Sequence, residues 1–289
     1  MAQISTIIPV FNRQTSAERA LRSALEQDVA DQEIVIVDDS SQPPFQVPVA
    51  LAKENVRVIR HPDNRGAAAA RNTGVEAAQG SWIAFLDSDD YWLPQTLLPR
   101  LAMAERVHAI TPSALAAYAA GFMLYNELSG RRETRIPRPS DNPLHFASGC
   151  WFSPGSTMLL RKEVFQQVGH FDPLLRRLED LDWFLRFALA GGRLESWPDT
   201  AAMVELGGKP DLAVLENAAR YLQAKYADRN SPYHLPPPYI RRLKAYLDIE
   251  RASIHAAQRR WAPTIYYITR SLLRAPRTTL HLERFWETA

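Results

Sequence analysis

Residues 82–86, Trp-Ile-Ala-Phe-Leu, constrain the fold more strongly than any other segment of the sequence. A short and mostly apolar run of this kind predicts a strand buried on both faces, and carboxylates follow it at Asp87, Asp89 and Asp90. In an open α/β sheet, ligands bind outside the carboxyl ends of the strands, so Asp87 and Asp89 are expected at the floor of such a crevice. Two carboxylates at this spacing can reach one hard divalent cation, although an acidic turn without a ligand produces the same pattern.

The sequence before this strand predicts a βαβ unit. A strand over residues 4–10, which Pro9 is expected to close, is followed by a helix and by a second strand over residues 33–37. A strand, a helix and a strand within about 35 residues form a unit whose two strands are parallel. The loops at residues 9–13 and 38–41 are therefore expected to meet at one edge of the sheet.

The rest of the chain alternates strands and helices and then becomes helical from Leu212 onward. A helix is predicted from residue 178 to Gly191, and acids in its first turn complement the helix dipole. Further expected elements are strands over residues 56–59, 116–124 and 156–160, and helices over residues 67–78 and from Pro94 to residue 103.

The charge of the chain is unevenly distributed. The 289 residues are 46% hydrophobic and carry a formal net charge of +2, which gives no argument for nucleic acid as a partner. From Pro238 to the end there are ten Arg or Lys and four Asp or Glu, a net charge of +6, so the preceding residues carry −4. The basic helical tail is expected to pack on the rest of the protein, to contact another subunit in a homo-oligomer, or to lie peripherally on an anionic membrane.

Three features bear on location. The single cysteine, Cys150, cannot form an internal disulfide, which suits a reducing compartment. The first residues show no basic region followed by an apolar core, so we expect no secretory signal. The longest uncharged run, residues 107–126, is interrupted by Pro112, so we expect no membrane-spanning helix there. The prediction is a cytoplasmic protein that can associate with the inner face of the membrane.

Five short motifs occur in a fixed order along the chain. They are residues 7–13 (Ile-Ile-Pro-Val-Phe-Asn-Arg), 37–41 (Val-Asp-Asp-Ser-Ser), 64–74 (Asn-Arg-Gly and Ala-Arg-Asn-Thr-Gly), 85–90 (Phe-Leu-Asp-Ser-Asp-Asp) and the pair Glu179-Asp180. Their order resembles that of the family-2 inverting glycosyltransferases, and five motifs in sequence are more specific than any one of them. The resemblance implies the GT-A fold, an α/β architecture with a Rossmann-like, mixed and mostly parallel sheet flanked by helices.

The resemblance covers about residues 4–206 and implies a division of the chain. Residues 1–207 would form the catalytic domain, with a nucleotide-binding half at residues 1–100 and an acceptor-binding half at residues 101–207. Residues 208–289 would form a basic helical extension to which the resemblance does not reach.

By the same resemblance, the first motifs would bind a nucleotide diphosphate-sugar. The backbone around Pro9 and Phe11 and the carboxylate of Asp39 would hold the base and ribose, because a carboxylate accepts hydrogen bonds from a uracil-like N–H or from hydroxyls. Arg13 would contribute to the same site, and Arg71, on the helix over residues 67–78, would face the nucleotide.

The acids after the central strand acquire a metal-binding role by this resemblance. Asp87 would contact ribose or sugar, and Asp89 would ligate Mn²⁺ or Mg²⁺, which neutralises the charge that develops on the diphosphate leaving group. Many relatives carry a late His that helps to hold the metal, whereas this chain has Met-Val-Glu-Leu at residues 203–206, so either coordination is thinner or Glu205 substitutes. The seven histidines lie in no ligand spacing, and we interpret them as structural or surface residues. A second departure is Ser40, where the family usually has Gly.

The resemblance implies that Asp180 is the catalytic base. The acceptor hydroxyl must lose its proton as it attacks the anomeric carbon, and a carboxylate on the far side from the diphosphate can accept it. Glu179 and Asp182 either orient Asp180 or the acceptor, or are simply acids at a helix N-terminus. Three aromatic residues could stack on an acceptor sugar, although buried aromatics more often belong to the core: Trp151, Phe152 and Trp183.

The predicted function is therefore an inverting glycosyltransferase. It would move a sugar from a nucleotide diphosphate donor, UDP-linked by preference, to a hydroxyl of a growing glycan such as a polysaccharide, an O-antigen or a lipid-linked oligosaccharide. One alternative is a sugar-phosphate nucleotidyltransferase. Such an enzyme would require a Gly-rich loop that binds triphosphate after the first strand, and residues 9–13 contain no Gly. The other is a glycosyltransferase-like module that binds nucleotide or glycan without turnover.

Overall fold

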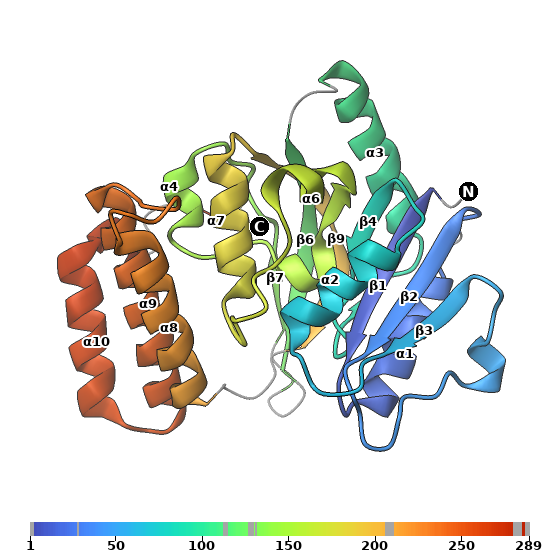
Figure 1. Ribbon diagram of the computed structural model, residues 1–289, viewed down its shortest axis with the longest axis horizontal. Helices are drawn as coiled ribbons and strands as arrows, with labels where there is room; N and C mark the ends of the chain where they lie inside the picture. Colours follow the sequence, from blue (N-terminus) through green and yellow to red (C-terminus); the bar gives the residue numbers. More distant parts are fainter. Residues whose placement is uncertain are drawn as a thin grey trace.

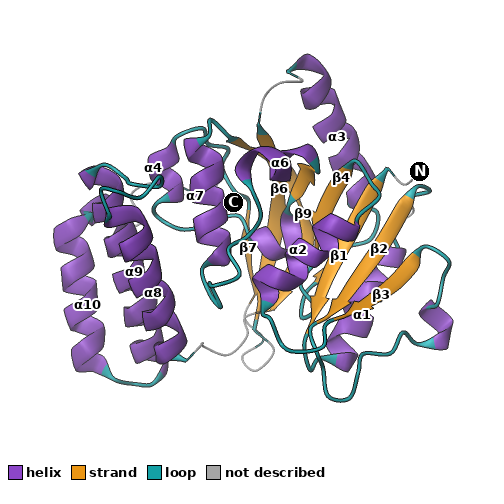
Figure 2. Cartoon of the chain, viewed as in Figure 1, coloured by secondary structure: helices purple, strands orange, loops and turns teal. Residues whose placement is uncertain are grey.

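A computed structural model of the protein describes residues 3–27, 29–111, 115–126, 130, 132–205, 211–279 and 285–286. Strands from these residues form one mixed sheet with helices on both faces, and a group of helices from the end of the chain packs beside it (Figure 1). The two kinds of structure are separated along the sequence. Figure 2 shows the strands gathered in one part of the molecule and helices alone in the other.

The first half of the sheet is parallel. It consists, side by side, of β3 (Val56–Arg60), β2 (Gln32–Asp38), β1 (Ile4–Val10) and β4 (Trp82–Phe85). The helix α1 (Gln14–Leu25) connects β1 to β2, so the predicted βαβ unit is confirmed.

Pro9 does not close the first strand as expected. It remains in the ladder opposite Val37 of β2, although β1 lies between two strands. The pairing of β1 with β4 ends at Ile7, whose carbonyl accepts a hydrogen bond from Leu86. Pro9, two residues further, faces the same side at a point where no ladder remains, so its missing N–H leaves no partner unsatisfied.

The second half of the sheet is mixed. It consists of β8 (Leu159–Arg161), β6 (Ala116–Tyr125), β9 (Arg193–Glu205) and β5 (Tyr91–Trp92), with β7 (Arg132–Arg135) paired to β6. The long pair β6 and β9 is parallel, so most paired residues of the whole sheet are in parallel register, as predicted. The helices around the sheet are α2 (Ala67–Ala77), α3 (Leu97–Ile110), α6 (Glu163–Val168) and α7 (Glu179–Leu189), with the short helices η1 (Val49–Leu51), α4 (Pro143–Phe146) and α5 (Pro154–Thr157).

Alternate side chains of β4 enter two separate hydrophobic cores. Trp82 and Ala84 pack with residues of α1 and α3, whereas Ile83 and Phe85 pack with residues of α2 and α7. All four are almost completely buried, as the apolar run predicts. Because both faces of the strand are covered, its carboxyl end is where the chain returns to solvent and where polar side chains can collect.

Two predicted elements begin or end elsewhere. The helix expected from Pro94 starts at Leu97, because the side-chain carbonyl of Gln27 accepts hydrogen bonds from the backbone N–H groups of Thr96 and Leu97 and so satisfies the first turn. The strand expected over residues 156–160 is preceded by the short helix α5, and β8 begins only at Leu159.

The extension consists of α8 (Leu212–Ala227), α9 (Pro237–Ala257), α10 (Trp261–Arg274) and α11 (Pro276–Thr279). Leu215, Leu222 and Leu243 of α8 and α9 belong to the same hydrophobic cluster as Phe184 and Phe187 of α7. The extension therefore packs directly on the part of the chain that carries the predicted base. The predicted boundary at residue 207 lies outside the described residues. Within the described ranges, the helices are too short or too polar to cross a membrane.

Candidate active site

The carboxyl ends of the parallel strands open into a cleft with two adjoining pockets. One, of about 540 Å³, is lined by the loops after β1 and β2, and we call it the β1 pocket. The other, of about 400 Å³, lies against the beginning of α7, and we call it the α7 pocket. Arg71, Asp87 and Asp89 line both pockets. The β1 pocket is further lined by the predicted residues Pro9, Phe11, Arg13 and Asp39, and the α7 pocket by Glu179, Asp180 and Glu205.

Asp39 is held in the β1 pocket by three hydrogen bonds. Its Oδ1 accepts from the backbone N–H of Arg65 (2.9 Å) and from Nδ1 of His61 (2.7 Å), and its Oδ2 accepts from the N–H of Gly66 (2.7 Å). Nε2 of His61 lies 2.9 Å from Oγ1 of Thr73, so α2, through Thr73, fixes the imidazole. The carboxylate thus has a set orientation, and Oδ2 keeps one unused acceptor position.

The interpretation of His61 as a structural or surface residue did not include its contact with Asp39. This residue is 4% exposed and touches the predicted nucleotide-binding acid. A signal for it exists in the sequence: His61 directly follows the third parallel strand, at the same edge as Asp39. Its hydrogen bond holds the carboxylate of Asp39 in place.

The two loops predicted to meet are tied together. The backbone N–H of Asn12 donates to Oγ of Ser41 (2.9 Å), and Oδ1 of Asn12 accepts from the N–H of Gln42 (2.7 Å). Ser40 has a φ of 68°, in the left-handed region that favours glycine, which accounts for the usual Gly at this position of the family motif. Ser40 therefore adopts a backbone conformation that favours Gly.

The acids after β4 form a cluster. One carboxylate oxygen from each of Asp87, Asp89 and Asp90 lies within 4.8 Å of the others. Oxygen ligands in such a set suit a hard divalent cation, so the residues fit Mn²⁺ or Mg²⁺. Asp89 is 29% exposed and forms an ion pair with Arg13, whereas Asp90 is buried and accepts hydrogen bonds from Ser156 Oγ and from the backbone of Glu205. Burial, and then the negative charge of Asp87, raise the pKa of Asp90 to about 8.

Arg71 joins the two pockets. Its guanidinium donates to Oδ1 of Asp87 and to Oε1 of Glu179, each at 2.7 Å, and the residue is only 7% exposed. Burial opposes its charge, but Asp87 and Glu179 raise its pKa above the ordinary value, so the cation persists. One buried arginine therefore connects the acid cluster after β4 to the first turn of α7.

Asp180 occupies the first turn of α7 and faces the α7 pocket. The preceding Leu178 has a φ of 63°, and this left-handed residue turns the chain sharply into the helix. Burial, and secondarily the neighbouring charge of Glu179, raise the pKa of Asp180 to about 6. A carboxyl with a pKa in this range is ionised at neutral pH and is a stronger proton acceptor than an ordinary aspartate.

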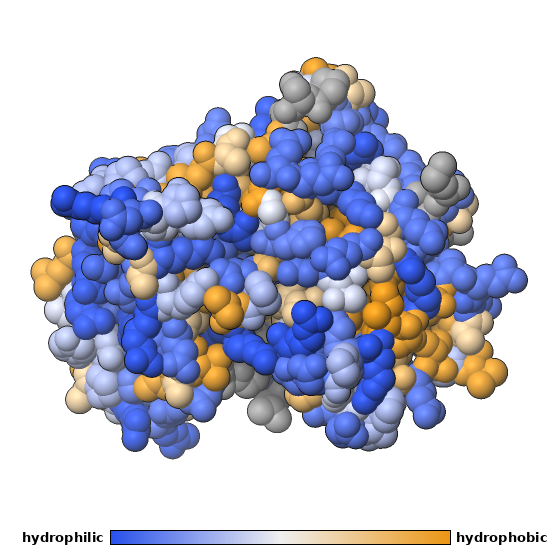
Figure 3. Space-filling model, in the orientation of Figure 1, coloured by the Kyte–Doolittle hydropathy of each residue, from blue (hydrophilic) through white to orange (hydrophobic). Residues whose placement is uncertain are grey.

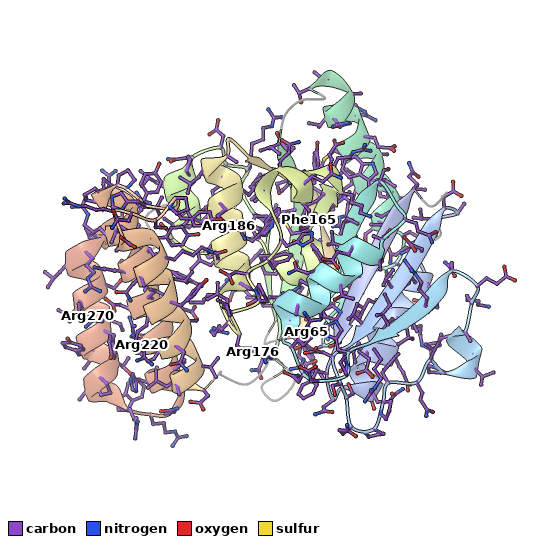
Figure 4. The ribbon with its side chains drawn as sticks, viewed as in Figure 1. Arg65, Phe165, Arg176, Arg186, Arg220 and Arg270 are labelled. Carbon is purple, nitrogen blue, oxygen red and sulfur yellow. The ribbon has the colours of Figure 1, made fainter. Side chains whose placement is uncertain are left out.

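Residues that the sequence did not indicate complete the walls. Gly155 approaches Asp87 so closely that a Cβ at this position would overlap the carboxylate. Val214 of α8 and Tyr246 of α9 line the α7 pocket, so the extension forms part of it. Arg176 lies near Arg65 (Figure 4), lines both pockets, and donates to the side-chain oxygen (2.7 Å) and the carbonyl (2.9 Å) of Asn64.

Trp183 is a correction to the predicted site. It is fully buried, its Nε1 donates to the carbonyl of Gly169 (2.7 Å), and its ring stacks on Phe187 with centroids 5.6 Å apart. Trp183 lies on the core side of α7 and does not reach the cleft. Trp151 and Phe152 are likewise buried in this core.

Asp182 also points into the core. It is fully buried and pairs with Nζ of Lys225 (2.7 Å) and with Nε of Arg186 (2.9 Å), and it accepts from the hydroxyl of Tyr226 (2.8 Å). Of the two interpretations of Asp182, orientation of the acceptor is excluded by this position. Its contacts instead attach α7 to α8.

Comparisons with known proteins identify the family of the chain. The sequence pattern of the family described as glycosyl transferase family 2 matches residues 5–169, more than half of the chain. WcaA of Escherichia coli K12, a glycosyl transferase named for colanic acid biosynthesis, is 32% identical over 208 residues, which are 67% of this chain and 68% of WcaA. An uncharacterized glycosyltransferase of Haemophilus influenzae is 29% identical over 63% of this chain and 61% of its own length. ExoO of Rhizobium meliloti, named for succinoglycan biosynthesis, is 29% identical over 66% of this chain.

The aligned region spans less than two thirds of the Haemophilus influenzae protein and 57% of ExoO. Among solved structures, S. aureus TarS 1-349 in complex with UDP-GlcNAc is similar, with a TM-score of 0.60 and 18% identity over 98% of this chain and 84% of that one. The likeness confirms the predicted α/β fold, in which helices flank a mixed sheet.

Proposed function

Because the chain belongs to glycosyl transferase family 2, we propose that it is an inverting enzyme that moves a sugar from a UDP-linked donor to a hydroxyl of a growing glycan. One observation carries the proposal. Asp180, with its raised pKa, and the acid cluster of Asp87, Asp89 and Asp90 line one cleft and are joined through Arg71 and Glu179. A proton acceptor and a group of metal-binding oxygens are thus available to the same bound substrate.

The β1 pocket is the proposed donor site. Oδ2 of Asp39, with one acceptor position unused, can accept a hydrogen bond from a uracil-like N–H or from a ribose hydroxyl. Pro9 and Phe11 offer backbone and an aromatic surface, and Arg13 and Arg71 supply positive charge for a diphosphate. The similarity in fold to a UDP-GlcNAc complex supports a nucleotide sugar as the ligand.

Asp89 is the proposed metal ligand, with Asp87 beside it. A bound Mn²⁺ or Mg²⁺ supplies positive charge that stabilises the departing diphosphate. Glu205 lines the α7 pocket together with Asp87 and Asp89, and its Oε2 pairs with Arg19 at 3.0 Å. We propose that Glu205 occupies the position of the late family His and that its ion pair with Arg19 orients the carboxylate.

The proposed reaction uses Asp180 as the general base. Its carboxylate accepts the proton of the acceptor hydroxyl while the hydroxyl oxygen bonds to the anomeric carbon, and the bond from that carbon to the diphosphate oxygen breaks with its electron pair on the leaving group. Attack from the side opposite the diphosphate inverts the anomeric configuration. Glu179 and Arg71 position Asp180 relative to Asp87.

The α7 pocket is the proposed acceptor site, and its walls from the extension would contribute to acceptor choice. WcaA and ExoO are named for the biosynthesis of polysaccharides, which supports a polysaccharide, an O-antigen or a lipid-linked oligosaccharide as the acceptor. The free thiol of Cys150 is compatible with a cytoplasmic reaction.

The test is the release of UDP from UDP-sugars with and without Mn²⁺. We expect slow, metal-dependent hydrolysis without an acceptor, and we expect Asp89→Ala to abolish it, whereas Asp199→Ala, at an exposed position of β9, leaves it unchanged. Turnover that Asp89→Ala does not affect would contradict the metal role. Donor binding without hydrolysis or transfer would favour the non-catalytic alternative.

A screen of nucleotide sugars would identify the donor. A ligand that binds only the folded protein raises the temperature of unfolding, so the correct UDP-sugar with Mn²⁺ should give the largest shift. Equal shifts with all nucleotides would contradict recognition of uracil in the β1 pocket.

A further inference from the structure

The helix α10 has its apolar face turned to solvent. Trp261 and Ile265 are each 63% exposed and Leu273 is 83% exposed, although a helix packed on a protein normally buries such side chains. Its buried face is polar: Thr264 and Ser271 point inward, and Oγ of Ser271 donates to the carbonyl of Ala245 in α9 (2.9 Å). We call the exposed set the α10 face; its members are Trp261, Ile265, Tyr266, Ile268 and Leu273.

This orientation is fixed by Asp248 of α9. The carboxylate is fully buried and accepts hydrogen bonds from Arg251 (3.1 Å), from Nε of Arg270 (3.0 Å) and from Arg274. Rotation of α10 that buried the α10 face would withdraw Arg270 and Arg274 and leave this buried carboxylate with Arg251 alone of its three arginine partners, which is unfavourable. The outward apolar face is therefore built into the fold.

The surroundings of the α10 face are strongly basic. From Pro237 to Thr279 the sequence has nine Arg or Lys and two acids, Asp248 and Glu250. Asp248 is buried and Glu250 pairs with Arg177 of the catalytic part, so neither offers a free negative charge at the surface. Arg241, Lys244 and Arg260, in contrast, make no ion pair with the carboxylates of the described ranges.

A cavity lies at the end of the same helix pair. It measures about 770 Å³, lies where α9 begins and α10 ends, and combines apolar walls with basic side chains. Its lining includes Leu235, Ile240, Arg229, Arg241, Lys244 and Arg274. The cavity shares no residue with the β1 or α7 pocket, so it does not belong to the candidate active site.

We propose that the α10 face docks on the surface of an anionic lipid bilayer. Its aliphatic and aromatic side chains would enter the headgroup region, and the surrounding arginines would pair with lipid phosphates. Figure 1 shows α10 at the outer edge of the molecule, and Figure 3 shows apolar surface at this left edge bordered by hydrophilic residues. A second copy of the chain is a poorer partner, because a two-fold contact would bring its basic residues against like charge.

The proposal goes beyond the transfer reaction and is tested without it. The full chain is sedimented with vesicles of phosphatidylcholine, alone or with phosphatidylglycerol. We expect binding to the vesicles with phosphatidylglycerol, weakened by added salt, and little binding to phosphatidylcholine alone. Binding that is absent from both, or equal for both, would overturn the proposal.

Matched variants test the face itself. Ile265→Gln with Leu273→Gln should weaken binding at least about tenfold, because the burial of two large aliphatic side chains exceeds one factor of ten in affinity. Arg260→Glu should weaken it roughly fivefold or more. The controls are Ile110→Gln and Arg106→Glu, at exposed positions of α3, which should bind as the wild type does.

Two further measurements decide the result. The α10 variants should keep the unfolding temperature and the UDP release of the wild type, because their side chains are exposed and remote from the cleft. Unchanged vesicle binding in the α10 variants would overturn the proposal. Self-association of the wild type that Ile265→Gln with Leu273→Gln abolishes would assign the face to a second copy instead. Loss of UDP release in Asp89→Ala, in contrast, concerns the proposed transfer alone.

Discussion

The β1 pocket and the α7 pocket share a boundary but are assembled differently. The β1 pocket is made by consecutive loops after parallel strands, with Arg176 and Val214 added from later in the chain. The α7 pocket combines residues 153–155 at the start of α5, the start of α7 and Tyr246 of the extension. The first is a local product of the βαβ unit, and the second depends on contacts between distant parts of the chain. Changes in the extension can therefore alter the α7 pocket and leave most of the β1 pocket intact.

The acids of the two pockets also differ in their surroundings. In the β1 pocket, Asp39 is satisfied by His61 and by two backbone N–H groups, which suits a carboxylate that binds and orients a ligand. In the α7 pocket, burial and the charge of Glu179 raise the pKa of Asp180, which suits proton transfer. This difference predicts that the two pockets can be damaged separately.

The largest separate effect is expected from Asp180→Asn. Removal of the base should lower kcat by roughly 10²- to 10⁴-fold, the usual contribution of general base catalysis. The affinity for UDP with Mn²⁺, measured by calorimetry, should be unchanged, because Asp180 does not line the β1 pocket. Asp141→Asn, at an exposed position, is the matched control. A parallel loss of UDP affinity would show that the pockets are not separable.

The attachment of α7 to the extension is tested by Asp182→Ala. The change removes one of the two carboxylates that pair with the buried Lys225, Asp172 being the other, and should lower the free energy of unfolding by about 1–3 kcal/mol. Urea unfolding measures the effect, and Asp182→Ala with Lys225→Met should cost less than the sum of the two single changes. Additive losses would mean that the pair does not couple α7 to α8.

Gly155→Ala is expected to damage both pockets, because the new Cβ would displace the Asp87 carboxylate that they share. Overpacking of this kind costs about 1–3 kcal/mol, which corresponds to roughly 5- to 150-fold weaker binding of UDP with Mn²⁺. Pro154→Ala, at the neighbouring position of α5, should have little effect on this affinity. Normal UDP binding in Gly155→Ala would show that Asp87 is not needed for the donor.

The smallest effect concerns pH. Asp180 acts as a base only when it is ionised, so kcat/KM should rise with pH and reach half of its maximum near pH 6, where burial places the pKa of the carboxyl. Glu179→Gln removes a like charge beside Asp180 and should move the rise of kcat/KM to lower pH. UDP affinity measured over the same range is the control for the β1 pocket. If Glu179→Gln does not shift the pH dependence of kcat/KM, the titrating group is not Asp180.

Much of the β1 pocket could be predicted from the sequence. The apolar run before Asp87 predicts a buried strand, and the short βαβ unit predicts parallel strands whose ends share one edge; both are confirmed. These features depend on local hydrophobic periodicity and on the handedness of short connections, which a sequence displays directly. The functional roles of Asp39, Asp89 and Asp180 remain predictions until the variants are measured.

The α7 pocket was less accessible to sequence reasoning. Trp183 and Asp182 occupy the first turns of α7 beside Asp180, but whether a helical side chain faces a cleft or a core depends on which surface the neighbouring helices cover. Tyr246 reaches the pocket across more than sixty residues of sequence, and no local pattern records that contact.

By itself, the sequence determined the order of strands and helices, the family and the acids at the strand ends, because these depend on short-range pattern. The tertiary structure alone decided which face of α7 meets the cleft, that the extension completes the α7 pocket, and that α10 turns its apolar side outward. Each of these depends on long-range packing. Buried carboxylates favour one orientation of a helix, because in another orientation Asp182 would lose Lys225 and Asp248 would lose Arg270 and Arg274.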